Sequence, residues 1–511
     1  MAVLNNSEEN SFDIIEPGFI QHGQEYIHHS GLSVKDTAFH RLIRKQIIII
    51  AVICALVIIG FILNWHATLL TLVAILTAYY VIQIGFDSFL CYRSLSRDNE
   101  IEISTQEVNK YSMEWPKYTI LCPLYDEANI LPQFVSAMKK LEYPADKLQI
   151  MLLLESNDDE TIKAAKNMRL GKSFEIVIVP ESQPQTKPKA LNYGLKRATG
   201  EYIVVYDAED IPEPRQLKQA VLAYQRVEPD VACIQSKLDY YNADQNLLTR
   251  LFTAEYASLF SLVLPGLQSI KAPIPLGGTS NHFQKKLLKE LGGWDAFNVT
   301  EDADLGIRLA KQGFRTVIMN SFTFEEASSR PKNWFKQRCR WIKGYIQTFF
   351  VHTRHLREFK STIRKPNSQL FQMVVGGKVA LMFINPIMLL ITILYFSLDA
   401  TIGATVRGFF PAPILYMAVG CILFGNFMYL YYYMLGCAKR EHWQIVKIVY
   451  LMPFYWLAMS AAAYVAVFEL VFRPYYWHKT LHGHHLGVEN IEHAALDTLR
   501  LDSKIPEAES A

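Results

Sequence analysis

Two strongly apolar regions, one near each end, dominate this chain of 511 residues and enclose a long segment of mixed composition. The first region contains the apolar runs 47–63 and 67–91, which Asn64 and its neighbours separate. A helix needs about 20 apolar residues to cross a bilayer. Residues 46–92 are therefore predicted to form a transmembrane hairpin, and a buried hairpin of a soluble protein is the alternative.

Basic residues predict the orientation of this hairpin. Arg44 and Lys45 precede it, and Arg93 and Arg97 follow it. Positive charge accumulates on the cytoplasmic side of membrane proteins. Both ends of the hairpin are expected in the cytoplasm, as are the polar N-terminal segment 1–45, which carries no secretory signal, and the central domain. The sequence thus indicates a multi-pass protein of the inner or plasma membrane.

The second apolar region predicts a C-terminal transmembrane part at 370–472, followed by a loop and tail at 473–511. Its apolar stretches are 379–398, 414–435 and 449–472. Three crossings would leave the C-terminus on the outer side of the membrane. A re-entrant stretch or an additional crossing would reverse that result, and prolines inside the stretches would break helices. The sequence leaves the number of crossings open.

Composition argues against two classes of protein. The formal net charge is only +2, so no nucleic-acid partner is expected. The 7 cysteines show no paired short spacing, and several lie in apolar runs. A disulfide framework is therefore not expected, which agrees with a reducing cytoplasm.

Residues 98–330, between the apolar regions, alternate strand-like and helix-like pieces. The predicted strands are 118–122, 148–154, 174–179 and 202–206, and the predicted helices are 130–140 and 189–197. Such alternation is typical of an α/β domain with a mostly parallel sheet and helices on both faces. Ligands bind these sheets beyond the carboxyl ends of the strands, where Glu155 and Asp207 are expected.

Carboxylates and ammonium groups follow several of these strands. Asp207 and Glu209 stand two positions apart, so both carboxylates can reach one Mg²⁺ or Mn²⁺ ion that also binds a diphosphate. Glu155 offers hydrogen-bond acceptors to a base or a ribose, and Lys187 and Lys189 offer charges to phosphates. A solvated acidic loop, a helix cap and a plain surface loop are the respective structural alternatives.

Asp302 is the candidate general base, because an acceptor hydroxyl needs a carboxylate within hydrogen-bond reach. It follows Thr300 and Glu301 and precedes a predicted helix at 303–311. The same residues would also make an ordinary helix start, with Thr300 as the cap.

Gln337, Arg340 and Trp341 share one face of a predicted helix, because they stand at i, i+3 and i+4. An arginine pairs with a diphosphate through two hydrogen bonds, and a tryptophan offers a stacking surface to a sugar ring. The surrounding segment 331–365 is basic and aromatic, which also predicts amphipathic helices resting on the membrane surface. The two interpretations are compatible.

With these motifs in order, residues 117–345 resemble the family 2 glycosyltransferases. The resemblance is to their membrane-embedded processive branch, which includes cellulose, hyaluronan, chitin, poly-N-acetylglucosamine and curdlan synthases. The motifs that carry it are Pro123-Leu-Tyr125-Asp-Glu127, Leu154-Glu155, Asp207-Ala-Glu209-Asp210, Gly277-Gly278-Thr279-Ser280-Asn281, Thr300-Glu301-Asp302 and Gln337-x-x-Arg340-Trp341. The resemblance implies a GT-A fold for 98–330, a UDP-sugar donor and a Mg²⁺ or Mn²⁺ cofactor.

The resemblance also implies roles for the matched residues, with Asp302 as the base and Asp207 and Glu209 as the metal pair. The expected donor-binding residues, which include the two lysines, are Pro123, Tyr125, Glu127, Glu155, Lys187, Lys189, Asp207, Gln337 and Arg340. The expected acceptor-binding residues are Gly278, Thr279, Ser280, Asn281, Glu301 and Trp341. Glu155-Ser-Asn departs from the Asp-Asp-Gly that is usual in the family. Residues 477–483 loosely resemble the gating loop of cellulose synthase.

The function expected from these features is an inverting transfer that extends a β-linked glycan at the membrane and moves it through a channel of membrane helices. Expected partners are the UDP-sugar, a growing glycan or lipid acceptor, membrane lipid and accessory subunits. One alternative is a non-processive enzyme that adds a sugar to a membrane lipid. A further alternative is an inactive transporter or scaffold.

Overall fold

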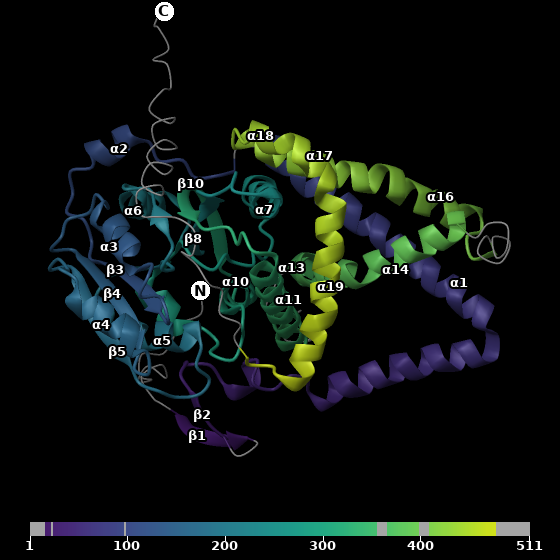
Figure 1. The fold of residues 1–511 in the computed structure, drawn as a ribbon, viewed down its shortest axis with the longest axis horizontal. Coiled ribbons are helices and arrows are strands. Elements are labelled where there is room, and N and C mark those ends of the chain that lie inside the picture. The colour runs from purple at the N-terminus through teal and green to yellow at the C-terminus, as the bar shows by residue number, and fades with distance from the viewer. Residues whose placement is uncertain (1–15, 22–23, 97–98, 355–364, 398–407, 477–511) are drawn as a thin grey trace, which may run out of the picture.

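The computed structural model describes residues 16–21, 24–96, 99–354, 365–397 and 408–476. In Figure 1 a sheet covered by helices lies at the left, and long helices extend away from it to the right. The segment 477–483, with its resemblance to a gating loop, lies outside the described residues.

The sheet has 8 strands in the order β5-β4-β3-β6-β9-β8-β10-β7. The strands are β3 (Tyr118–Leu124), β4 (Leu148–Glu155), β5 (Phe174–Val179), β6 (Tyr202–Val205), β7 (Ile211–Pro212), β8 (Val231–Tyr240), β9 (Asn281–Gln284) and β10 (Arg315–Glu325). The neighbouring pairs β5–β4, β4–β3 and β3–β6 are parallel, and so is the pair β8–β10. β9 is antiparallel to β6 and β8, and β7 is antiparallel to β10. The predicted α/β fold with a mixed, mostly parallel sheet is confirmed.

Each face of the sheet packs against its own set of helices, because successive side chains of a strand point to opposite faces. One face packs on α3 (Leu131–Lys139), α4 (Asp159–Asn167) and α6 (Gln216–Arg226), with Ile120 and Leu152 in the shared core. The other face packs on α5 (Lys187–Arg197) and α10 (Glu301–Lys311), with Leu121 and Leu153 in the core. This packing places the carboxyl ends of β3, β4 and β6 at one edge of the sheet, next to α10.

Helix α1 (Arg44–Ser96) runs through both apolar stretches of the predicted hairpin and bends at Asn64. The φ and ψ of Asn64 are −157° and 91°, which are not helical values. Its side chain accepts a hydrogen bond from the backbone N of Ala67 at 2.9 Å, as a cap does at the start of a helix. The two arms of α1 therefore diverge at this residue, as Figure 1 shows.

Among the described residues, 5 helices are long and apolar enough to cross a membrane, by length and composition. They are Arg44–Ser96, Leu247–Ser269, Ser368–Leu390, Ala412–Lys439 and Trp443–Phe472. They include α7 (Leu247–Ser258), α8 (Leu264–Ser269), α14 (Lys378–Ser397), α16 (Ala412–Gly420), α17 (Asn426–Lys439), α18 (Trp443–Val446) and α19 (Met452–Phe472). Pro386 lies inside α14 without ending it, so this proline does not break the helix.

The helix pair α7 and α8 differs from the other long apolar helices in its burial. Of its 18-residue apolar stretch, 67% is buried inside the protein. At its start, Asn246 Nδ2 donates to the backbone O of Ser329 at 2.9 Å. Near its end, Gln268 Oε1 accepts from the backbone N of Ile318 at 2.8 Å. Both ends are thus attached to the sheet domain.

Helix α19 packs along α11 (Pro331–Thr353), which follows the sheet domain, and is bonded to α11 near both of its ends. Near its start, the hydroxyl of Tyr455 accepts from Trp334 Nε1 at 3.1 Å. Just after its end, Lys343 Nζ donates to the backbone O of Tyr476 at 2.9 Å. In Figure 1, α19 runs across the direction of α14 and α17 rather than along it.

The remaining described elements connect these parts. They are β1 (Glu16–Gln21), β2 (Gln24–His28), η2 (Val34–Asp36), α2 (Thr105–Lys110), η3 (Leu259–Val263), α9 (Lys285–Glu290), α13 (Lys365–Phe371), η4 (Gln372–Gly377), η5 (Cys421–Gly425) and η6 (Lys447–Leu451). The turn between α17 and α18 rests on β8, because Arg440 Nη1 donates to the backbone O of Leu238 at 2.5 Å.

Candidate active site

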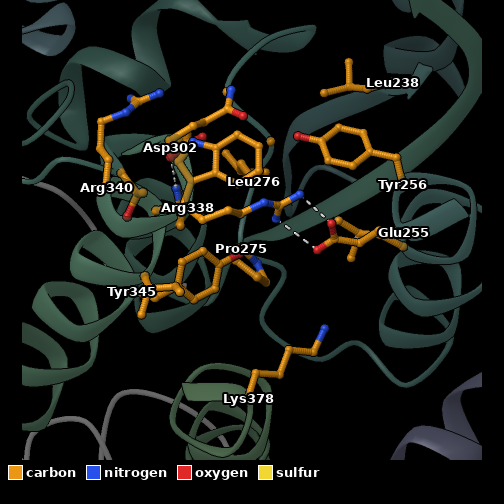
Figure 2. Close-up of a pocket in the computed structure, with 18 of the residues that line it drawn as sticks. Leu238, Glu255, Tyr256, Pro275, Leu276, Asp302, Arg338, Arg340, Tyr345 and Lys378 are labelled. Atoms are coloured by element: carbon orange, nitrogen blue, oxygen red, sulfur yellow. Dashed lines mark hydrogen bonds and ion pairs between the residues drawn. The ribbon is translucent and has the colours of Figure 1, made fainter. Parts of the chain in front are cut away.

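One cavity of about 520 Å³ opens beyond the carboxyl ends of β3, β4 and β6 and continues among the apolar helices. Figure 2 shows part of its lining. The cavity brings together most of the residues that the sequence singled out. Those that line it are Pro123, Tyr125, Glu127, Glu155, Lys187, Asp207, Glu209, Gly278, Glu301, Asp302, Gln337, Arg340 and Trp341.

Glu155 is the last residue of β4, and its carboxylate lies at the cavity wall. Lys189 Nζ lies 2.6 Å from Glu155 Oε2 and also donates to the backbone O of Pro180 at 3.0 Å. Lys189 is only 1% exposed and is not among the lining residues, so the structure places it beneath Glu155 rather than in the cavity. Burial raises the pKa of Glu155, while the ammonium group of Lys189 acts in the opposite direction.

Asp207 and Glu209 follow β6 and line the cavity, whereas Asp210 points back into the protein. Asp210 Oδ2 accepts a hydrogen bond from the backbone N of Asp207 at 2.6 Å and another from the hydroxyl of Thr279. These bonds fix the turn that presents the first two carboxylates. Burial, followed by the charge of Asp207, raises the pKa of Glu209 to about 8. The acidic turn is therefore a concentration of negative charge that a cation would relieve.

Lys187 is the nearest described cation to this turn. Its Nζ lies 2.5 Å from Asp207 Oδ1 and donates to the backbone O of Gly278 at 2.8 Å. Burial would lower the pKa of Lys187, but the carboxylates of Asp207 and Glu301 raise it above its usual range. The lysine thus stays charged between the acidic turn and the start of α10.

Gly278 leaves open the space between the two main carboxylates of the site. A Cβ atom added at Gly278 would lie 3.4 Å from Asp302 Oδ2, 3.9 Å from Lys187 Nζ and 4.0 Å from Asp207 Oδ2. The general-base candidate and the metal-ligand candidate therefore face the same small volume. A reacting group placed there would contact both.

Three predicted acceptor residues, Thr279, Ser280 and Asn281, do not line the cavity. All three are buried, because the chain enters the central strand β9 here and packs between β6 and β8. Thr279 Oγ1, which bonds to Asp210, also lies 3.0 Å from the backbone O of Val205, and Ser280 Oγ donates to Thr323 Oγ1 at 2.6 Å. Asn281 Nδ2 donates to the backbone O of Gly277. The structure corrects the expectation for these residues, which support the wall that Gly278 forms.

Asp302 lies in the first turn of α10 and points into the cavity near Arg340 (Figure 2). Its Oδ1 accepts from the backbone N of Ala303 at 2.7 Å. Burial raises its pKa, and the backbone N–H and Lys187 counteract this rise. Thr300 occupies the N-cap position, as the structural alternative predicted, but its hydroxyl donates to Asn298 Oδ1 at 3.4 Å instead of capping the helix.

Gln337, Arg340 and Trp341 all face the cavity from α11, as their spacing predicted. Burial lowers the pKa of Arg340, and the carboxylates of Glu301 and Asp302 oppose that effect. The centre of the Trp341 ring lies 6.3 Å from that of Tyr256 and 6.0 Å from that of Phe252, both of which belong to α7. The site therefore has a polar, charged half near β6 and an aromatic half toward α7.

The aromatic half contains residues that the sequence analysis did not identify. They include Glu255, Tyr256, Arg338, Lys378, Asn385, Tyr429, Tyr455 and Ser460. They come from α7, α11 and the C-terminal helices, so only the folded chain brings them together. A signal was present nonetheless, because Glu255 and Lys378 are charged residues within or beside apolar helices, where charges mark functional positions.

Comparison with known proteins agrees with this geometry. Residues 116–344 match the family described as "Glycosyltransferase like family 2". "Probable glycosyltransferase YdaM" of Bacillus subtilis (strain 168) is 28% identical over 255 residues, which are 49% of this chain and 60% of the relative. "Cellulose synthase 1 catalytic subunit [UDP-forming]" of Komagataeibacter xylinus is 27% identical over 243 residues, covering 47% of this chain and 32% of the relative.

A plant relative covers a similar part of the chain. "Probable glucomannan 4-beta-mannosyltransferase 10" of Arabidopsis thaliana is 28% identical over 244 residues, covering 46% of this chain and 44% of the relative. The matched part spans between 32% and 60% of the length of these relatives. The part of this chain that contains the sheet, the acidic turn, Asp302 and Arg340 is a family 2 glycosyltransferase domain.

Proposed function

We propose that this protein is an inverting glycosyltransferase that uses a UDP-sugar and a divalent cation to extend a β-linked glycan at a membrane. One observation carries the proposal. A single cavity runs from Glu155 and Asp207 past Asp302 to Asn385 and Tyr429 on apolar helices. A donor at one end and a growing product at the other would fit such a continuous, partly polar path. The UDP-forming relative supports the choice of donor.

The residues divide the chemistry between a base and a group of cations. Asp302 takes the proton of the acceptor hydroxyl, and the hydroxyl oxygen attacks the anomeric carbon of the donor sugar. The bond from that carbon to the diphosphate breaks on the opposite side, which inverts the configuration. Lys187 and Arg340 stabilise the negative charge that develops on the leaving diphosphate. Trp341 holds the acceptor sugar beside the base.

A divalent cation fits the acidic turn, although no group of three or more His, Cys, Asp or Glu side chains forms a ready metal site in the described part of the chain. Asp207 and Glu209 would hold a Mg²⁺ or Mn²⁺ ion, and diphosphate oxygens would complete its ligands. The pKa of Glu209, which burial and then the charge of Asp207 raise to about 8, agrees with this assignment, because a cation beside the two carboxylates would lower it again. When bound, the ion would neutralise charge on the diphosphate.

The contacts of α7–α8 and α19 support a membrane topology with four crossings: two in α1, one in α14 and one in α16–α17. Both ends of α19 are bonded to α11, the helix predicted to rest on the membrane surface, which suggests that α19 lies along that surface as well. Its exposed side chains are apolar, among them Phe454, Phe468 and Phe472. An even number of crossings leaves 473–476 on the same side as the sheet domain. We assign that side to the cytoplasm.

The protein in lipid nanodiscs with Mn²⁺ tests this function when UDP-glucose, UDP-N-acetylglucosamine and GDP-mannose are supplied in turn. Nucleotide release and the size of labelled product are measured. A long polymer from one UDP-sugar is the expected result, and it would name the sugar. A polymer from GDP-mannose would support glycan extension but contradict the choice of a UDP-sugar. A single sugar on extracted lipid would replace this proposal with the lipid transferase. No turnover with any donor would contradict both.

A further inference from the structure

Arg338 lies inside the cavity although it occupies an unspecified position of the Gln-x-x-Arg-Trp motif. Its side chain is only 4% exposed. Nη1 donates to Glu255 Oε1 at 3.0 Å, and Nη2 donates to Glu255 Oε2 at 2.5 Å. Figure 2 shows this paired interaction at the centre of the lining. Two parallel bonds to one carboxylate fix the plane of the guanidinium group.

Aromatic rings surround the fixed guanidinium group. Its central carbon lies 4.6 Å from the ring centre of Trp341 and 4.3 Å from that of Phe252. The rings of Trp334 and Tyr455 are each 5.6 Å away. A guanidinium group attracts aromatic faces at these distances. Since Glu255 sets the position of the guanidinium group, Arg338 in turn restrains the indole of Trp341.

Three helices contribute to this arrangement. Glu255 comes from α7, Arg338 from α11 and Tyr455 from α19. The hydroxyl of Tyr455 accepts from Arg338 Nη2 at 2.6 Å and donates to Glu255 Oε2 at 2.6 Å. The two helices other than α11 belong to the apolar part of the molecule. The position of Trp341 therefore depends on how those helices pack against the sheet domain.

We infer that Arg338 is a positioning residue that, through its pair with Glu255, holds the Trp341 indole where it stacks on the acceptor sugar. This inference rests on the proposed function, in which Trp341 binds the acceptor. Arg338 acts on the acceptor through Trp341, and its guanidinium group is bonded to Glu255 and Tyr455 rather than to an expected donor-binding residue. Its effect falls on acceptor binding and on the fraction of reactions that reach the acceptor rather than water.

The test separates positioning from simple stability by using R338M, E255M and the double variant R338M/E255M. Each single variant leaves a buried charge without its partner, which is destabilising. The double variant removes both charges with side chains of similar length, and replacing a buried ion pair by apolar residues is often neutral for stability. The double variant is thus expected to unfold at nearly the wild-type temperature, yet it still lacks the guanidinium group that restrains Trp341.

Two measurements on these proteins in nanodiscs follow the indole and the acceptor. Hydroxyl-radical footprinting with mass spectrometry measures the oxidation of Trp341 without any substrate. Transfer to cellotetraose from UDP-glucose, or to β-1,4-mannotetraose from GDP-mannose if the donor panel selects mannose, gives the acceptor KM. Donor affinity is measured separately by calorimetry with the same nucleotide sugar.

In the double variant we expect severalfold faster oxidation of Trp341, an acceptor KM raised by about tenfold and an unchanged donor affinity. R338K is expected to restore neither the slow oxidation of Trp341 nor the low acceptor KM, because an ammonium group lacks the planar paired contact. Wild-type oxidation and acceptor KM in a stable double variant would overturn the inference. An inactive wild-type protein would count against the proposed function, whereas the footprint of Trp341 decides its positioning in either case.

Discussion

Lys187 Nζ lies 2.5 Å from Asp207 Oδ1, so the acidic turn and a lysine are paired in the site. Donor binding would replace this arrangement with a cation on the carboxylate and phosphate oxygens near the ammonium group. We therefore expect K187M to lower kcat/KM by about 10- to 100-fold, the worth of a charge-assisted hydrogen bond.

K187M is also expected to strengthen the binding of a metal ion, although it lowers kcat/KM. K187M removes the charge that neutralises Asp207, so Mn²⁺ alone should stabilise the variant more than the wild-type protein against thermal unfolding. The exposed Lys172 provides the matched control, and K172M should change neither quantity. Equal Mn²⁺ stabilisation and equal kcat/KM in K187M and wild type would argue against a role for Lys187.

Substitution of Gly278 tests whether the space between Asp302 and Asp207 must stay open for the reaction. G278A adds a methyl group 3.4 Å from Asp302 Oδ2, in the volume where the reacting groups would meet. A misplacement of about 1 Å costs about 100-fold in rate, so transfer should fall by that order with little loss of stability. G171A is the control, because its added Cβ meets only Phe174 at 3.9 Å. Normal transfer by G278A would place the reaction elsewhere.

Gly344 predicts an effect at a distance from the chemistry. A Cβ atom added there would collide with the side chain of Thr300, directly before Glu301 and Asp302. Overpacking of this kind costs about 1–3 kcal/mol and displaces the backbone. G344A should lower the unfolding temperature and reduce kcat at least about tenfold while donor affinity is retained. G85A adds a Cβ that meets no described atom within 4 Å, and it should behave as wild type.

Glu301 predicts how stability depends on pH. Burial and the neighbouring Asp302 raise its pKa to about 8 in the folded protein, compared with 4.5 for the free group. The folded state therefore binds the proton more tightly than the unfolded chain. Its contribution to stability is fully present below about pH 4.5 and is lost as the pH rises through about 8.

The corresponding variant is E301Q, which stays neutral at every pH. Between pH 5 and pH 8 its unfolding temperature should fall less than that of the wild-type protein, and at pH 8 it should be the more stable of the two. Thermal unfolding in detergent at several pH values measures this difference. Parallel curves for the two proteins would show that Glu301 does not titrate in this range.

The sequence predicted the strands and the cavity edge well, because local patterns determine both. β3, β4, β5 and β6 begin at the predicted residues, because each is a short apolar run that the chain's own pattern marks. Gln337, Arg340 and Trp341 face the cavity because three- and four-residue spacing on a helix sets a common face. β3 extends beyond its predicted end at Cys122 to Leu124, since strand pairing with β4 continues there.

Other features depend on contacts between distant parts of the chain. Lys189 and Asn281 carry polar groups that suit a ligand, but pairing with Glu155 and the position of β9 bury them. Helix α7 escaped notice because Arg250 and Glu255 interrupt its apolar character. The length of α19 predicts a crossing, whereas its contacts at Tyr455 and after Phe472 attach both of its ends to α11. Spacing along the chain contains none of this information.

The central claim is that Asp302 removes the acceptor proton during sugar transfer. The most direct measurement compares wild type and D302N, in nanodiscs with Mn²⁺, for donor affinity and for labelled product from the active nucleotide sugar. We predict unchanged donor affinity and a loss of product formation by about 100- to 10,000-fold, the usual contribution of a general base. Wild-type rates of product formation in D302N would contradict the account.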